Sequence, residues 1–130
     1  MGHSRCHDRT LTVAARLAAV IRIDAVWIAT EPMDMRAGAD RLLARVVQVF
    51  GAAQAHHGYL FGNVRGTRIK LLLHDGFGVW CAARRLNQGR FQWPAPGSTG
   101  PAELTRQQFD ALVLGLPWQR LQDMQRITRV

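Results

Sequence analysis

The spacing of apolar residues predicts one amphipathic helix in the first half of the chain. Asp34 belongs to the residue types that cap the start of a helix, and Gly51 to those that end one. We therefore expect a helix that begins shortly after Asp34 and ends at Phe50. The apolar residues that recur at i, i+3, i+4, i+7, i+8 and i+11 are Ala39, Leu42, Leu43, Val46, Val47 and Phe50.

A second helix is predicted toward the end of the chain. Thr105 and Gln108 have the spacing of a capping box, in which each side chain accepts a hydrogen bond from the backbone N–H of the other residue. Pro117 has no backbone N–H and cannot continue a helix. The pattern therefore predicts a helix from about Arg106 to Leu116.

Four other segments have the composition of β-strands and are bounded by turn residues. Arg65-Gly66 lies between the second and third segments and Asp75-Gly76 between the third and fourth, and both pairs are typical of hairpins. The sequence thus predicts an α+β fold, in which a small antiparallel sheet of about four strands, with a central meander, is packed by two helices. The strand-like segments are residues 21–29, Tyr59–Val64, Thr67–Leu73 and Gly78–Leu86.

A chain of 130 residues has room for one domain. We expect residues 20–118 to form it, residues 1–19 to be a poorly ordered extension, and residues 119–130 to be a polar tail. No apolar run approaches the roughly 18 residues that a membrane-spanning helix needs. Cys6 and Cys81 lie far apart and do not form a disulfide framework, which favours a reducing cytoplasm.

The chain is strongly basic, with a net charge of +8, and all but one of its 17 basic residues are arginines. The planar guanidinium group binds phosphates and carboxylates through two hydrogen bonds at once, so this bias suits nucleic acid or an acidic protein surface. Arginine richness can also follow from a GC-rich genome. Between residues 65 and 90, however, six basic residues stand against the single acid Asp75, which favours a binding surface in this segment.

Strand alternation predicts where these side chains point. Arg68 and Lys70 should lie on one face of their strand, and Ile69 and Leu71 on the other, so that one face packs and the other is charged. Such a face could follow a phosphate backbone, with nearby aromatic rings either stacking on bases or packing in the core. The candidate binding residues in and after this segment are Arg65, Arg68, Lys70, Arg84, Arg85, Arg90 and Trp93.

Arg36 is a further candidate for binding. We expect it in the first turn of the first helix, where the helix dipole disfavours a cation by roughly 0.3–1 kcal/mol. Stability does not explain a cation there, whereas a phosphate or a partner carboxylate at that helix end would.

The sequence does not indicate a metal site or a catalytic site. His56 and His57 are adjacent, so they cannot readily face one metal ion from a strand. An acidic-triad transposase needs three carboxylates that converge on metal ions, but we expect Asp34 as a cap, Asp75 in a turn and Asp110 on an exposed helix face. We therefore expect no catalytic residue, no cofactor and no metal, and a small nuclease is the least supported alternative.

Four segments in the same order resemble the TnpB family, the accessory proteins encoded beside the transposase in sixty-six-type bacterial insertion sequences. The resemblance covers about residues 20–118. Residues 31–38 (EPMDMRAG) resemble the family's TDMR-x-G, residues 70–78 (KLLLHDGFG) its K-L-L-x-x-D-G-x-G, residues 84–94 (RRLNQGRFQWP) its KRL-x-x-GRF-x-WP, and Glu103-Leu104-Thr105 with Gly115-Leu116-Pro117-Trp118 its closing helix.

The chain departs from the family pattern at three places. Gly62-Asn63 stands where the family often has Phe and Arg, and Arg84 replaces the usual Lys but keeps its charge. Residues 1–19 have no counterpart. Because family members begin with Met-Ile-Arg and this chain has Val20-Ile21-Arg22, we hypothesise that Val20 is an alternative start.

The resemblance implies a non-catalytic accessory protein that acts in transposition alongside a separate transposase. Its arginine-rich face would bind the DNA of the element, the partner transposase, or both. The alternative is a protein interaction module that binds the transposase without touching nucleic acid.

Overall fold

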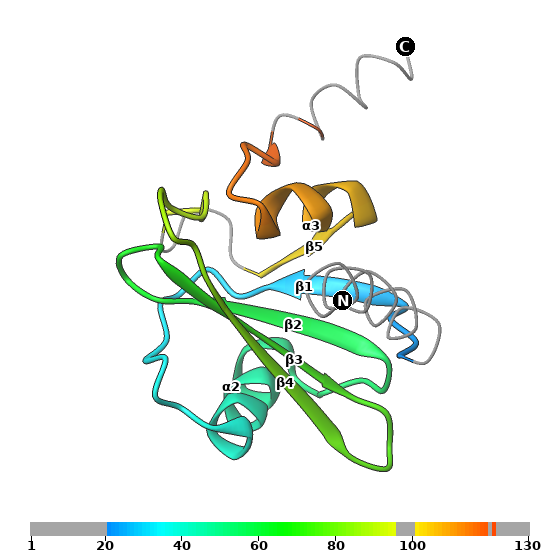
Figure 1. Cartoon of the computed structure of the whole chain (residues 1–130). Helices are drawn as coiled ribbons and strands as arrows, with labels where there is room; N and C mark the ends of the chain where they lie inside the picture. Colours follow the sequence, from blue (N-terminus) through cyan, green and yellow to red (C-terminus); the bar gives the residue numbers. More distant parts are fainter. Residues whose placement is uncertain (1–20, 96–100, 120, 122–130) are drawn as a thin grey trace, which may run out of the picture.

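The computed structural model describes residues 21–95, 101–119 and 121. The predictions for residues 1–19 and for most of residues 119–130 lie outside the described residues, and so does Cys6. In the described ranges a single five-stranded sheet has the strand order β4-β3-β2-β1-β5 and carries two helices (Figure 1). The elements are β1 (Ala25–Ile28), α2 (Ala39–Phe50), β2 (His57–Gly62), β3 (Arg68–His74), β4 (Val79–Arg85), β5 (Ala102–Leu104) and α3 (Arg106–Val113). The predicted α+β class is confirmed.

The β1–α2–β2 segment places two parallel strands side by side. β1 pairs with β2 from Ala25↔His57 to Ile28↔Leu60. Parallel neighbours need a crossover connection, and α2 provides it. All other strand pairs of the sheet are antiparallel, so the expectation of a wholly antiparallel sheet is wrong at this one pair.

The central meander is confirmed. β2, β3 and β4 pair with each other in antiparallel order. Asp75 shapes the second hairpin, because its carboxylate accepts hydrogen bonds from the backbone N–H groups of Phe77 and Gly78 at 2.9 Å each. These two donors lower the pKa of the Asp75 carboxyl.

The end of the chain adds a strand that the sequence did not predict. β5 has three residues and pairs antiparallel with β1, from Val26↔Leu104 to Ile28↔Ala102. α3 follows at once, and its predicted capping box is present: Thr105 accepts from the Gln108 N–H at 3.1 Å, and Gln108 accepts from the Thr105 N–H at 2.9 Å. α3 ends at Val113 and not at Leu116.

The start of α2 corrects another expectation. The helix begins at Ala39, its N-cap is Gly38, and no side chain caps it. Asp34 therefore is not the helix cap. It lies in a turn before the helix, where it accepts a hydrogen bond from the Arg36 N–H at 2.9 Å. The predicted end is confirmed, because Gly51 has a positive φ of 84° and donates to the Val47 carbonyl.

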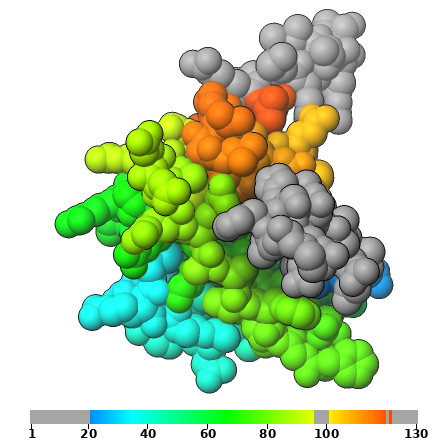
Figure 2. All heavy atoms as spheres, viewed as in Figure 1, coloured from blue at the N-terminus to red at the C-terminus, as the bar shows by residue number. Residues whose placement is uncertain are grey.

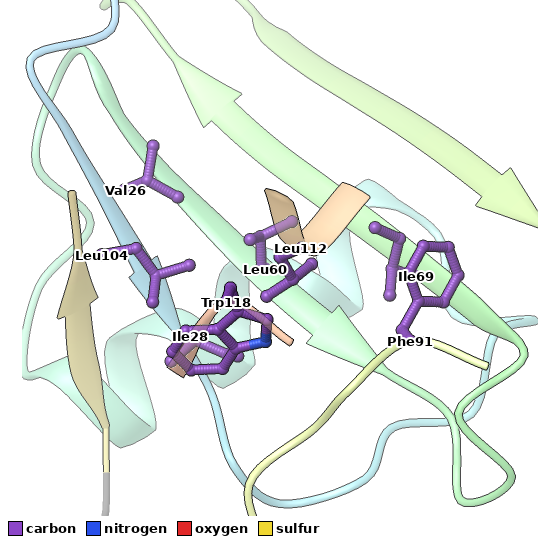
Figure 3. Packing of buried hydrophobic residues seen from close by; sticks show 8 residues of the cluster. All are labelled: Val26, Ile28, Leu60, Ile69, Phe91, Leu104, Leu112 and Trp118. Atoms are coloured by element: carbon purple, nitrogen blue, oxygen red, sulfur yellow. The ribbon is translucent and has the colours of Figure 1, made fainter. Parts of the chain in front are cut away.

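Both faces of the sheet are covered by hydrophobic packing. α2 lies against one face, where Leu42 and Val46 pack with Tyr59, Phe61 and Leu72. On the opposite face, α3 and the segments around it form a second core (Figure 3). Its buried members are Val26, Ile28, Leu60, Ile69, Phe91, Leu104, Leu112 and Trp118.

Candidate binding surface

Two adjoining hollows lie where the segment before α2 meets β3 and β4. The larger, of about 560 Å³, is lined by residues 32–36 and by the β2–β3 turn. The smaller, of about 330 Å³, is lined by β3 and β4. Met35 and Arg68 line both hollows and so join them. Arg84 also lines the smaller hollow, but its side chain is bound to the Val113 carbonyl. We call the other basic residues around the two hollows the arginine surface: Arg36, Arg65, Arg68, Lys70 and Arg85.

The arginine surface is assembled from three separate parts of the chain. In Figure 2 the cyan segment before α2, the green β2–β3 turn and the yellow-green end of β4 lie together along the left side of the view. No single stretch of sequence therefore contains the whole surface.

Asn63 fixes the turn that presents Arg65. Its side-chain oxygen accepts from the backbone N–H groups of Thr67 at 2.9 Å and Arg68 at 3.1 Å. Its side-chain nitrogen donates to the Thr67 hydroxyl at 2.9 Å. These bonds all lie within the turn, in which Arg65 is exposed.

The strand register brings two further arginines together. Arg68 of β3 stands directly opposite Arg85 of β4, and both are exposed. Like charges at directly opposed positions destabilise a sheet. Among the described residues neither guanidinium forms an ion pair that would offset this repulsion.

Lys70 has a structural partner. Its ammonium group donates to the Ala37 carbonyl at 2.9 Å, and the residue is half-buried. The same strand face continues to Leu72, which is buried beneath α2. The expectation of one packed and one charged face on β3 is therefore wrong along most of the strand, because only the end near Arg68 is charged and open.

Arg36 lies in the turn before α2 and not in its first turn, which corrects the expected position. Its side chain is 90% exposed and holds both oxygens of Asp34, with Nε at 3.1 and 3.2 Å and Nη2 at 2.8 Å. This contact lowers the pKa of Asp34 to about 2. The helix dipole therefore plays no part in explaining this cation.

Arg84 and Arg90 border the arginine surface but are not part of it. Arg84 precedes Arg85, so its side chain points to the opposite face of the sheet, where Nε donates to the Val113 carbonyl of α3 at 2.7 Å. Arg90 is exposed in the loop after β4. The Phe91 N–H donates to the Gly66 carbonyl at 2.7 Å, which places Arg90 beside the turn that carries Arg65.

Trp93 and Phe91 belong to the packed interior. Trp93 is half-buried against Gly62, and its indole N–H donates to the Ala29 carbonyl at 3.1 Å. Phe91 is 3% exposed. Phe77, in the β3–β4 turn, is fully exposed, and Trp80 is 48% exposed on the face of β4 that bears Arg84. Neither of these two rings lines the hollows of the arginine surface.

The described residues contain no group of three or more His, Cys, Asp or Glu side chains that could hold a metal ion. His57 accepts a hydrogen bond from the Trp27 indole at 3.0 Å, so this ring is part of the packing. Asp110 is exposed and forms an ion pair with Arg106 at 3.1 Å. In the same ranges, none of the helices has the length and apolar character needed to cross a membrane.

Two residues that line the hollows were not among the binding residues predicted from the sequence. Met35 forms the junction of the hollows, and Asn63 builds the turn. Asn63 carried a usable signal, because Asn is a residue type that hydrogen-bonds to the backbone of its own turn. Met35 carried none, since its position depends on how the segment before α2 packs.

Comparisons with known proteins identify the family of this chain. The sequence model of the family described as "IS66 Orf2 like protein" matches residues 24–123. Two curated relatives come from Sinorhizobium fredii strain NGR234, and both are named only as uncharacterized proteins. The protein y4hO is 33% identical over 106 residues, which are 81% of this chain and 91% of the relative. The protein y4jC is 31% identical over 98 residues, which are 74% of this chain and 82% of the relative. No solved structure matches significantly.

Proposed function

The chain belongs to the IS66 Orf2-like family of transposition-associated proteins, and from this premise we propose that it is a non-catalytic accessory factor that binds the phosphate backbone of element DNA through the arginine surface. The observation that carries the proposal is the opposed pair Arg68 and Arg85 with Arg65 beside it. All three side chains are exposed, and none has an ion-pair partner among the described residues. Phosphate groups would relieve the repulsion that the register creates.

The environment of the aromatic rings favours duplex DNA over single strands. Proteins that bind single strands usually stack bases on exposed aromatic side chains. Here Phe91 and Trp93 are held in the interior, so the arginine surface offers charge and hydrogen-bond donors without a stacking platform. Binding of this kind is governed by phosphate contacts, which position a protein on DNA without reading its sequence.

The non-catalytic part of the proposal is supported by how the carboxylates are used. Asp34 is bound by Arg36, Asp75 accepts from two backbone N–H groups, and Asp110 pairs with Arg106. Each of these groups has a local structural role, and they do not gather around one position. We assign the chemistry of transposition to the separate transposase.

A second candidate is direct binding to an acidic surface of the transposase. Arg36 favours this possibility, because it already holds both oxygens of the Asp34 carboxylate. A carboxylate is therefore a ligand that this part of the arginine surface accepts in a two-bond geometry. The same side chains would then contact Asp or Glu residues of the partner.

Two binding assays separate these candidates. In mobility shifts, the full chain should retard duplex DNA, and the complex should weaken as salt is raised, since phosphate contacts release counterions. In parallel, tagged protein should be purified with the transposase of the same element after nuclease treatment. Salt-sensitive retardation supports DNA binding. Absence of retardation together with nuclease-resistant co-purification would replace it with transposase binding, and failure of both assays would remove the proposal.

The matched variants are Arg65→Gln/Arg68→Gln and Arg22→Gln/Arg106→Gln. Both pairs lower the net charge by two, but Arg22 and Arg106 lie outside the arginine surface. Only the first pair should weaken DNA binding strongly. Equal losses from both pairs would mean that net charge, and not this surface, is responsible.

A further inference from the structure

The proposed function uses the side chain of Arg85 at one end of β4 but leaves the free backbone edge of this strand without a role. β4 is the outermost strand of the sheet, and all seven of its residues are exposed. At the other edge of the sheet, β5 has only three residues and is followed directly by α3. An exposed edge strand carries unpaired backbone groups that can pair with another strand.

β4 lacks most of the features that protect edge strands. It contains no proline, its pairing with β3 is continuous from Arg68↔Arg85 to His74↔Val79, and its only charges are Arg84 and Arg85 at one end. At the other end Val79 is 43% exposed and Trp80 48%. The strand is therefore apolar in its first half and cationic in its second.

An apolar groove adjoins this edge. It has a volume of about 700 Å³, and Trp80 and Ala82 of β4 line it together with Leu71, Leu73 and Phe109. Arg84 follows along the same face of the strand. A strand added to the edge would place its own side chains next to this groove.

We propose that β4 pairs with β4 of a second copy of this chain, antiparallel and centred on Ala82, so that two sheets join into one. In this register Ala82 meets the partner's Ala82, Trp80 lies beside the partner's Arg84, and Val79 lies beside the partner's Arg85. No arginine is directly opposite another, and each guanidinium gains an aromatic or aliphatic neighbour. The small side chains at the centre let the two strands approach.

This self-complementarity is why the occupant is a second copy. When two copies of β4 pair in antiparallel order, the apolar end of each strand lies beside the cationic end of the other, so like charges do not face each other. Centring the pair on Ala83 instead would leave Trp80 opposite the partner's Leu86 and Val79 opposite the partner's Asn87. Paired strands alone bury less than the roughly 800 Å² per partner of a standard interface, so the dimer should dissociate on dilution.

Sedimentation velocity of the full chain over a range of concentrations tests the proposal. The wild type should shift from monomer to dimer as concentration rises. Trp80→Lys should remain monomeric, because it places a cation beside the partner's Arg84. Val64→Lys is the matched control, since Val64 is 85% exposed in the β2–β3 turn and the variant adds the same charge; it should dimerise like the wild type.

Cross-linking provides a second readout that does not depend on the Trp80 variant folding. In a background without Cys6 and Cys81, Ala82→Cys should form a disulfide-linked dimer on mild oxidation, because directly opposed Cα atoms lie about 4.5–5.5 Å apart, within the roughly 4.4–6.8 Å that a disulfide spans. Val79→Cys should not, since its copies would be about 20 Å apart along the strands. The proposal is overturned if the wild type stays monomeric and Ala82→Cys forms no disulfide-linked dimer. It is also overturned if the wild type dimerises but Trp80→Lys still dimerises and Ala82→Cys does not cross-link.

Discussion

Replacing Gly62 by alanine should destabilise the domain, because Trp93 occupies the space that a side chain would need. A Cβ atom at residue 62 would lie 3.0 Å from Cδ2 and Cε2 of the indole and 3.3 Å from Cε3. Such contacts are too short for carbon atoms, so the ring must move. The ring also donates a hydrogen bond from its N–H to the carbonyl of Ala29, the residue after β1.

The magnitude follows from three contributions. Overpacking of this kind costs about 1–3 kcal/mol. Loss of the indole hydrogen bond adds about 0.5–1.5 kcal/mol. Replacing a glycine restricts the unfolded chain and returns about 0.4–1 kcal/mol. Together these contributions predict that Gly62→Ala lowers the free energy of unfolding by about 0.5–4 kcal/mol, which is a fall in Tm of roughly 2–20 °C for a domain of this size.

Urea unfolding followed by circular dichroism measures this loss. Gly78→Ala is the matched control, since no atom lies within 4 Å of its added Cβ, and it should raise stability by up to about 1 kcal/mol through the unfolded chain alone. In a Trp93→Leu background the Gly62→Ala substitution should cost much less, because the obstructing ring is gone. A Gly62→Ala protein as stable as the wild type, or the same loss with and without Trp93, would refute the reasoning.

Three other outcomes follow from the described contacts. Leu112→Ala should lower the free energy of unfolding by about 2–5 kcal/mol in urea titrations, since this leucine is fully buried in the core beneath α3; a loss below this range would show that the site collapses around the cavity. Thr105→Ala should cost about 0.5–2 kcal/mol in the same assay, because the hydroxyl that accepts from the Gln108 N–H is removed. Asp34→Asn should be less stable than the wild type near neutral pH, because the ion pair between Asp34 and Arg36 is lost. The pKa of Asp34 is lowered from 3.8 to about 2 in the folded chain, so the difference in stability should disappear as pH falls from about 4 toward 2. An undiminished difference at pH 2 would contradict this.

Local signals in the sequence predicted most of the elements. The apolar period defined α2 to its last residue, and the spacing of Thr105 and Gln108 defined the start of α3. The hairpin glycines located the meander within one or two residues of the observed strand ends. These features depend on contacts between residues close in sequence, which is why pattern alone identifies them.

Other parts of the fold depend on contacts between distant residues. β5 is only three residues long and exists because it pairs with β1, more than 70 residues earlier in the chain. α2 begins at Ala39 with Gly38 as its N-cap, whereas the sequence alone equally allowed a helix cap at Asp34. A helix between β1 and β2 was the signal for their parallel pairing.

The candidate site was predictable in composition but not in geometry. Alternation correctly separated Arg68 from Ile69, and the two lie on opposite faces of β3. It could not show that Lys70 is engaged by the Ala37 carbonyl, or that Arg84 is directed to α3 while Arg85 joins the arginine surface. Those assignments require the strand register and the position of each helix.

The most direct test of the arginine surface is the salt dependence of DNA affinity, measured by fluorescence anisotropy on a labelled duplex from the end of the element. The logarithm of the association constant should fall linearly with the logarithm of salt concentration, and each lost phosphate contact should reduce the slope by about 0.9. Arg65→Gln/Arg68→Gln should therefore flatten the slope by about 2, while Arg22→Gln/Arg106→Gln leaves it near the wild-type value. Identical slopes for the wild type and the Arg65→Gln/Arg68→Gln variant would contradict the assignment of this surface to DNA.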